Sequence, residues 1–168
     1  MLQRVSERTP TLPADPPALA AALEATGYLP DEGLATAAYL ALAMHRPLFL
    51  EGEAGVGKTA LARALAEVTG RPLYRLQCYE GLEASQALYD WDFGRQLLHL
   101  RAAEAAHATG DTEALEASLY DRRFLLARPL LQALEDSPSV LLVDEIDRAD
   151  DEFEAFLLEV LSDFTISI

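Results

Sequence analysis

A glycine-rich stretch at residues 52–59 has the residue types and the spacing of a phosphate-binding loop. Its sequence, GEAGVGKT, matches the pattern G-x-x-x-x-G-K-[ST]. The glycines allow the backbone to curl around an anion, so that N–H groups at the start of the next helix point to phosphate oxygens. Lys58 would neutralise the β- and γ-phosphates, and the hydroxyl of Thr59 would hold Mg²⁺. The predicted phosphate-binding residues are Gly52, Glu53, Ala54, Gly55, Val56, Gly57, Lys58, Thr59 and Ala60.

The competing explanation of this stretch is a chance match in a structural turn. Residues 47–51 ahead of it form a short apolar run typical of a buried strand, and residues 59–69 after it have the apolar spacing of a helix. A loop between a strand and a helix is the context that distinguishes a true P-loop. The position of the motif therefore favours a genuine phosphate site.

A second group of chemically capable residues, Asp144 and Glu145, follows the apolar run at residues 140–143. Ligands gather at the carboxyl ends of parallel strands. Asp144 would support Mg²⁺ through water, and Glu145 would polarise a water molecule for attack on the γ-phosphate. An acidic pair after an apolar run is by itself usually the start of a solvated loop, but with a P-loop upstream it indicates a Walker B motif. The predicted catalytic residues are Glu145 and Lys58, and the predicted metal-site residues are Thr59 and Asp144.

The acidic pair also distinguishes between classes of nucleotide-binding enzymes. Asp followed by Glu suits an enzyme that hydrolyses ATP with water, whereas a lone Asp suits a kinase or a simple GTPase. The sequence has no N-K-x-D motif for reading guanine. We therefore predict an ATPase that uses ATP and Mg²⁺. Two alternatives stay open: a nucleotide-binding module that does not hydrolyse ATP by itself, and, less favoured, a P-loop kinase.

The elements expected to position these residues alternate between strands and helices. Apolar runs predict buried strands at residues 47–51, 73–78 and 140–143. Helical spacing and stop signals predict helices at residues 18–26, 31–45, 59–69 and 128–136 and after Asp147. Residues 164–168 alternate like a further strand. The pattern predicts an α/β fold of the P-loop NTPase type, with a parallel sheet between two layers of helices.

Length and proline content give the domain organisation. The chain of 168 residues suits one globular domain. Four prolines near the start, Pro10, Pro13, Pro16 and Pro17, forbid a continuous helix there and predict an extended arm over residues 1–17. The folded domain is expected to occupy residues 18–168.

Charge and cysteine content exclude several classes of partner and compartment. The net charge of −15 repels phosphate backbones and anionic membranes, and the apolar runs are too short to cross a bilayer, so we expect neither nucleic acid nor membrane as a partner. The single cysteine, Cys78, lies in a predicted strand and fits an inert buried thiol better than a nucleophile. With charges rather than an apolar core at the N-terminus, the sequence predicts a cytoplasmic location.

Four stretches resemble the MoxR branch of the AAA+ ATPases, and the similarity extends from residue 27 onward. They are GYLPD at residues 27–31, PLFLEGEAGVGKT at 47–59, LQCYEG at 76–81 and LLVDEIDRAD at 141–150. Residues 77–81 and 89–91 are also similar to the accessory ATPases of carbon monoxide dehydrogenase maturation. By position, the resemblance gives Lys58, Thr59, Asp144 and Glu145 the roles described above.

The resemblance has further implications for assembly and for the extent of the domain. It implies a homo-oligomeric ring, commonly a hexamer, that remodels client proteins or assists metal-cofactor insertion, with a von Willebrand factor A domain protein as a frequent partner. It places residues 27–28 near the adenine and explains residues 84–128 as an inserted helical segment. It also implies that residues 18–168 are the N-terminal part of an AAA+ domain, truncated after Walker B, without sensors, arginine finger or lid. In the AAA+ strand order, residues 48–50 and 140–143 would then lack a shared partner strand.

The roles of Arg148 and of two stretches rich in aromatic and acidic residues stay open. Arg148 fits a contact with a neighbouring subunit as well as a local ion pair. The aromatic and acidic residues at 79–83 and 89–93 fit a core better than a surface that faces a client or a central pore.

Overall fold

The structure, a computed structural model, describes residues 12–53, 55–105 and 112–163. Ala54, most of the predicted arm and the predicted strand at residues 164–168 therefore lie outside the described residues.

Three helices form the N-terminal part of the fold. They are α1 (Pro16–Ala25), α2 (Glu32–Met44) and α3 (Lys58–Thr69). The side chain of Asp15 caps α1 by accepting a hydrogen bond of 2.8 Å from Ala18 N. The predicted boundary of the arm at residue 17 is therefore wrong by two residues, because proline is tolerated in the first turn of a helix, where its missing N–H has no partner to lose.

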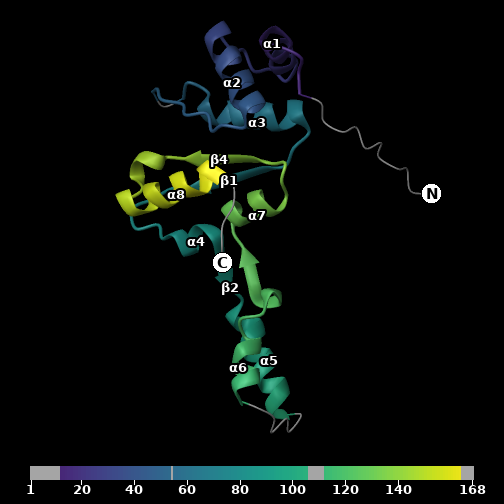
Figure 1. Ribbon diagram of the computed structural model, residues 1–168, viewed down its shortest axis with the longest axis vertical. Helices are drawn as coiled ribbons and strands as arrows, with labels where there is room; N and C mark the ends of the chain where they lie inside the picture. The colour runs from purple at the N-terminus through teal and green to yellow at the C-terminus, as the bar shows by residue number, and fades with distance from the viewer. Residues whose placement is uncertain (1–11, 54, 106–111, 164–168) are drawn as a thin grey trace, which may run out of the picture.

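Within the described residues, the central sheet consists of two parallel strands. They are β1 (Leu73–Gln77) and β4 (Val140–Asp144), paired in register from Leu73 with Val140 to Gln77 with Asp144. Helices α1 to α3 lie on one side of these strands, and α4 (Ala84–Leu88), α7 (Pro129–Glu135) and α8 (Asp151–Asp163) lie on the other (Figure 1). The prediction of a parallel sheet with helices on both faces is confirmed.

Two apolar clusters hold these layers together. The cluster among α1, α2 and α3 consists of Leu19, Leu23, Ala38, Leu61, Ala64 and Leu65. The cluster between the sheet and α4, α7 and α8 consists of Leu76, Cys78, Leu82, Ala87, Leu88, Leu130, Leu131, Phe153, Leu157 and Val160. Helix α3 joins the two parts because it also contacts β4 and β1.

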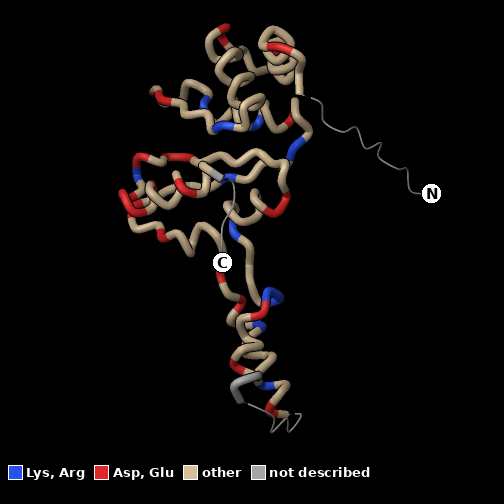
Figure 2. Tube along the Cα trace, in the orientation of Figure 1, with Lys and Arg blue, Asp and Glu red and all other residues tan. Residues whose placement is uncertain are grey.

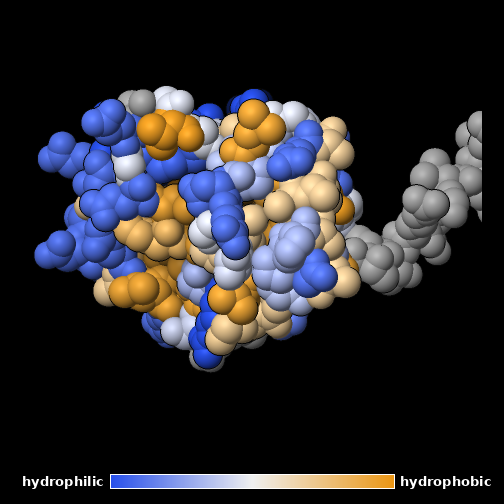
Figure 3. Space-filling model, turned by 90° about the horizontal axis from the view of Figure 1, so that it is seen from above, coloured by the Kyte–Doolittle hydropathy of each residue, from blue (hydrophilic) through white to orange (hydrophobic). Residues whose placement is uncertain are grey.

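The predicted buried strand at residues 47–51 is wrong. These residues form no strand, and the side chain of Phe49 is 74% exposed. The surface on the side of α1 to α3 carries apolar side chains among polar ones (Figure 3). A strand needs a neighbour for its backbone hydrogen bonds, and within the described residues β4 pairs only with β1. Leu48 and Leu50 instead pack, half-buried, against the cluster of α1 to α3.

Residues 89–105 and 112–127 project away from the rest of the molecule (Figure 1). They contain β2 (Tyr89–Trp91), α5 (Phe93–Ala105), α6 (Thr112–Ser118), the 3-10 helix η1 (Arg122–Phe124) and β3 (Leu125–Ala127). Strands β2 and β3 are antiparallel and join the projection to α4 and α7. The sequence predicted an insertion here but not its two strands, because runs of three residues are too short to show an alternating pattern.

Three aromatic residues of this projection are in ring contact. The rings of Tyr89 and Trp91 meet edge to face at 5.7 Å between centroids, and Trp91 meets Tyr120 in the same way at 5.5 Å. The two aromatic side chains of β2, Tyr89 and Trp91, are half-buried, as expected for a core role, whereas Phe93 is 70% exposed. Among the described residues, no helix is long and apolar enough to cross a membrane.

Candidate functional site

The glycine-rich loop adopts backbone conformations that a side chain would disfavour. Gly55 has φ = 86° and Gly57 has φ = 95°, both in the left-handed region. Gly57 is the N-cap of α3, so the loop turns directly into the helix that begins at Lys58. The strand expected before the loop is missing, but the loop and the helix after it are arranged as predicted.

The first turn of α3 presents free backbone donors. The first hydrogen bond of the helix runs from Leu61 N to Gly57 O at 3.0 Å, so the N–H groups of Lys58, Thr59 and Ala60 have no partner within the helix. With the positive end of the helix dipole, these donors can hold phosphate oxygens. The first turn of α3 therefore has the local geometry of an anion-binding site.

Lys58 is folded back on the loop that precedes it. Its Nζ donates to the carbonyl oxygen of Glu53 at 3.0 Å and also to that of Gly52. The side chain is half-buried, and the loop beside it is exposed, with Val56 60% exposed. The ammonium group thus lies beside residues 52 and 53 at the start of the loop, within reach of a phosphate bound by the loop.

Tyr28 packs against the end of the loop. A Cβ atom placed on Gly57 would lie 3.5 Å from Cε2 of Tyr28 and 3.9 Å from its hydroxyl oxygen. Burial, with a smaller contribution from the charge of Asp31, raises the pKa of Tyr28, so the phenol stays neutral at physiological pH. Residue 28, expected near the adenine, is thus next to the predicted phosphate-binding residues.

Asp144, the last residue of β4, is paired with an arginine of β1. Its Oδ2 accepts hydrogen bonds from Arg75 Nη2 at 2.7 Å and from Arg75 Nε at 3.2 Å. The same Nη2 donates to Gln77 Oε1 at 2.6 Å. The two oxygen-bearing residues predicted for Mg²⁺, Thr59 and Asp144, fit a hard cation by their chemistry, and α3 packs on the strand that ends in Asp144.

Glu145 is held by a different arginine. It lies just beyond β4 in the left-handed region (φ = 55°), which is uncommon for a residue with a side chain. Its Oε2 is 2.9 Å from Nε of Arg148, three residues further on in the 3-10 helix η2 (Ile146–Arg148). The local ion pair considered for Arg148 is therefore present. Acidic residues gather around the end of β4 and the start of α8 (Figure 2).

The pairing of Asp144 with Arg75 was not predicted from the sequence. It depends on the register of β1 against β4, which brings together residues that are far apart in the chain. The available signal was the position of Arg75 near the carboxyl end of a predicted strand. That signal does not identify the neighbouring strand.

Cys78 is buried at the end of β1. Its side chain is 1% exposed. Burial, and then the charges of Asp144 and Asp147, raise the pKa of the thiol to about 11. A thiol that stays protonated at neutral pH is a poor nucleophile. The prediction of a buried thiol is confirmed, and the raised pKa is consistent with an inert one.

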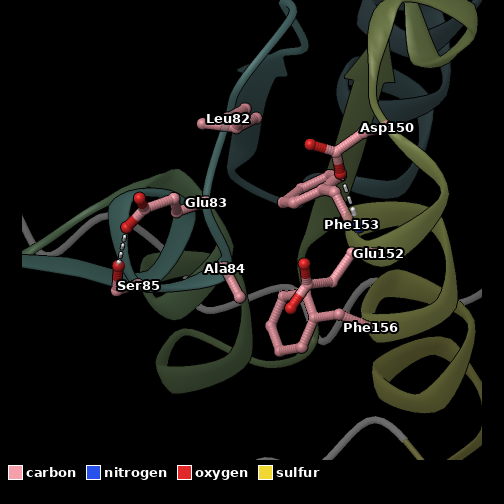
Figure 4. Close-up of a pocket in the computed structure, with 8 residues that line it drawn as sticks. All are labelled: Leu82, Glu83, Ala84, Ser85, Asp150, Glu152, Phe153 and Phe156. Atoms are coloured by element: carbon pink, nitrogen blue, oxygen red, sulfur yellow. Dashed lines mark hydrogen bonds between the residues drawn. The ribbon is translucent and has the colours of Figure 1, made fainter.

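A separate pocket of about 480 Å³ lies between residues 82–85 and the start of α8 (Figure 4). Apolar side chains, including Leu82 and the rings of Phe153 and Phe156, form part of its wall, and carboxylates surround them. Asp150 Oδ1 accepts a hydrogen bond of 3.0 Å from Phe153 N and so caps α8. None of the predicted nucleotide-site residues lines this pocket.

A loop with free donors at the start of a helix, and a strand that ends in one acidic residue and is followed directly by a second, define a P-loop nucleotide-binding protein. The sequence matches the family described as AAA domain (dynein-related subfamily) over residues 47–168. The chain belongs to this family.

Two curated relatives match the chain as well. The chain is 30% identical over 141 residues to Protein NorQ of Paracoccus denitrificans (strain Pd 1222), and the aligned stretch covers 80% of this chain and 48% of NorQ. The chain is 46% identical over 48 residues to Midasin of Giardia intestinalis, and this alignment covers 29% of the chain and 1% of Midasin. The chain thus spans about half the length of NorQ. No solved structure matched. The predicted membership of the MoxR branch of AAA+ ATPases is confirmed.

Proposed function

We propose that this chain binds ATP with Mg²⁺ and hydrolyses the γ-phosphate bond, as part of an AAA+ ATPase of the MoxR type. The observation that carries this proposal is the first turn of α3, where three free N–H groups and the ammonium group of Lys58 lie beside a glycine loop. Such a turn suits the phosphates of a nucleotide.

Each predicted residue has a role that its position supports. Lys58 would exchange the carbonyl oxygen of Glu53, 3.0 Å away, for phosphate oxygens, because a charged acceptor binds an ammonium more strongly than a neutral one. Thr59 and Asp144 would hold Mg²⁺, and the N–H groups of Lys58, Thr59 and Ala60 would bind phosphate oxygens. Mg²⁺, when bound, withdraws negative charge from the β- and γ-phosphates.

Glu145 would act as the general base of hydrolysis. To do so it would have to turn its carboxylate from Arg148, now 2.9 Å away, towards a water molecule. The pair is largely exposed, with side-chain exposures of 65% and 47%, so breaking it is expected to require less than about 1 kcal/mol. Freeing the carboxylate of Glu145 therefore needs only a small local rearrangement.

Membership of the family supports a proposal for the wider role of the protein. We propose that it assembles into a ring, commonly a hexamer, in which ATP hydrolysis drives the remodelling of client proteins or assists the insertion of a metal cofactor into a metalloenzyme client. A von Willebrand factor A domain protein would be a partner. The net charge of −15 argues against nucleic acid and anionic membranes as partners. The single cysteine and the charged N-terminus support the proposal of a cytoplasmic location.

A single-turnover assay with γ-labelled ATP, Mg²⁺ and an excess of the chain tests the proposed activity. We expect release of inorganic phosphate. ATP binding without any phosphate release would favour the nucleotide-binding module, and transfer of the label to a small metabolite would favour the kinase. Sedimentation velocity with and without ATP tests the ring, and a monomer under both conditions would contradict it.

A further inference from the structure

The charged residues at the carboxyl end of the sheet include one cation that the proposed chemistry does not use. Arg75 lies on the edge strand β1 and contacts Asp144 through two nitrogen atoms, at 2.7 Å and 3.2 Å from Oδ2. Both nitrogen atoms donate to the same oxygen, so the contact is a charge-assisted hydrogen bond that leaves Oδ1 of Asp144 without a bond to Arg75. Arg75 is thus bound to the carboxylate that the proposed function needs for Mg²⁺.

The alternation of side chains along β1 places Arg75 on the same face as Asp144. Leu76 and Cys78 are buried in the cluster with α8, so Arg75 and Gln77 point to the opposite face. Helix α3, which begins at Lys58, lies on that side of the strands (Figure 1). Arg75 therefore shares its side of the sheet with the predicted phosphate site.

Gln77 gives Arg75 a second partner. Its Oε1 accepts from Arg75 Nη2 at 2.6 Å, and Gln77 lies directly beside Asp144 in the register of the sheet. Arg75 can therefore release Asp144 and keep a hydrogen bond. The side chain of Arg75 is 51% exposed and that of Asp144 is 23% exposed, so the released guanidinium can also be hydrated.

We propose that Arg75 is a positioning residue that acts as the counter-ion of Asp144 when no metal is bound and is displaced when Mg²⁺ arrives with ATP. This inference rests on the proposed function. Without metal, Arg75 offsets the charge of Asp144 and reduces its repulsion of the ATP phosphates. With metal, Mg²⁺ competes with Arg75 for the same carboxylate, because a cation close to a metal ligand opposes the metal. Arg75 thus limits the degree to which ATP binding depends on Mg²⁺.

The test compares the Kd of ATP with EDTA and with Mg²⁺, measured by calorimetry. The Kd with EDTA divided by the Kd with Mg²⁺ gives the coupling between metal and nucleotide. We expect Arg75→Met, which keeps a long side chain but removes the charge, to bind metal-free ATP more weakly and Mg·ATP more tightly. The ratio should rise at least about fivefold, the effect expected for a neighbouring charge in a partly exposed site. Arg75→Lys, which keeps a cation, should stay near the wild-type ratio.

A matched control is Arg122→Met, which breaks the ion pair of Arg122 with Glu135 away from the P-loop. It should leave the ratio unchanged. A general defect of Arg75→Met would raise both Kd values by the same factor and leave their ratio unchanged. An unchanged or lower ratio would therefore overturn the inference. If Arg75→Met does not fold, Arg75→Gln is measured in its place and judged by the same ratio. A wild-type chain that binds no ATP under either condition would instead contradict the proposed function, and the inference with it.

Discussion

Nε of Arg148 lies 2.9 Å from Oε2 of Glu145, so the predicted catalytic base is engaged in an ion pair. Glu145→Gln keeps the size of the side chain but removes the charge that a general base needs. We expect ATP to bind with unchanged affinity and hydrolysis to slow by about 10² or more. Phosphate release under single-turnover conditions measures the effect, and Glu154→Gln, on α8, serves as the control. Wild-type turnover by Glu145→Gln would remove Glu145 from catalysis.

Gly57→Ala tests the backbone of the P-loop. Because Gly57 has φ = 95°, a residue with a Cβ atom is strained there, and that atom would also contact Tyr28 at 3.5 Å. We expect ATP affinity to fall at least about tenfold, as the loop shifts to relieve strain of about 1–2 kcal/mol. Gly94→Ala, at a helical glycine without positive φ, is the control and should bind ATP normally. Equal affinities of the two variants would contradict the loop geometry.

Phe153→Ala tests the cluster that joins α8 to the sheet. The side chain is 2% exposed and belongs to the buried cluster that also contains Leu76 and Leu130, so its removal should lower the free energy of unfolding by about 3–5 kcal/mol. Phe93→Ala, which removes a ring that is 70% exposed, should change it by less than about 1 kcal/mol. Urea denaturation followed by circular dichroism gives both values. Similar losses for the two variants would show that α8 does not pack as described.

The raised pKa of the Cys78 thiol leads us to expect a loss of stability at high pH. The pKa of its thiol is about 11 in the folded chain and 9.0 as the unperturbed value, so between these values the unfolded chain loses the proton first. The free energy of unfolding should therefore fall as pH rises from 9 to 11, by at most about 1.4 kcal/mol per pH unit from this group. Cys78→Ala should be less sensitive to pH than the wild type when urea denaturation is measured at pH 8 and pH 10.5. The same slope in both chains would contradict the raised pKa.

The parts of the site that the sequence predicted depend on residues that are close together in the chain. The glycine loop, the start of α3 and the acidic end of β4 each follow from a local pattern, and each lies where that pattern indicates. The prediction of a strand at residues 47–51 was wrong because a strand needs a partner strand from elsewhere in the chain, and a local apolar run does not reveal that partner. Arg75 was missed for the same reason, since strand register alone brings it to Asp144.

The measurement that tests the central claim most directly is the affinity of Lys58→Ala for ATP, determined by calorimetry in the presence of Mg²⁺. Lys58 is the one side chain of the P-loop that carries a positive charge, and its loss leaves the triphosphate without that neutralising contact. The matched control is Arg63→Ala, which removes an exposed cation further along α3. We predict that Lys58→Ala binds ATP at least about 100-fold more weakly than the wild type, as expected for a lost charge-assisted contact of about 3 kcal/mol, and that Arg63→Ala binds normally. Wild-type affinity in Lys58→Ala would contradict the assignment of residues 52–60 as the nucleotide site.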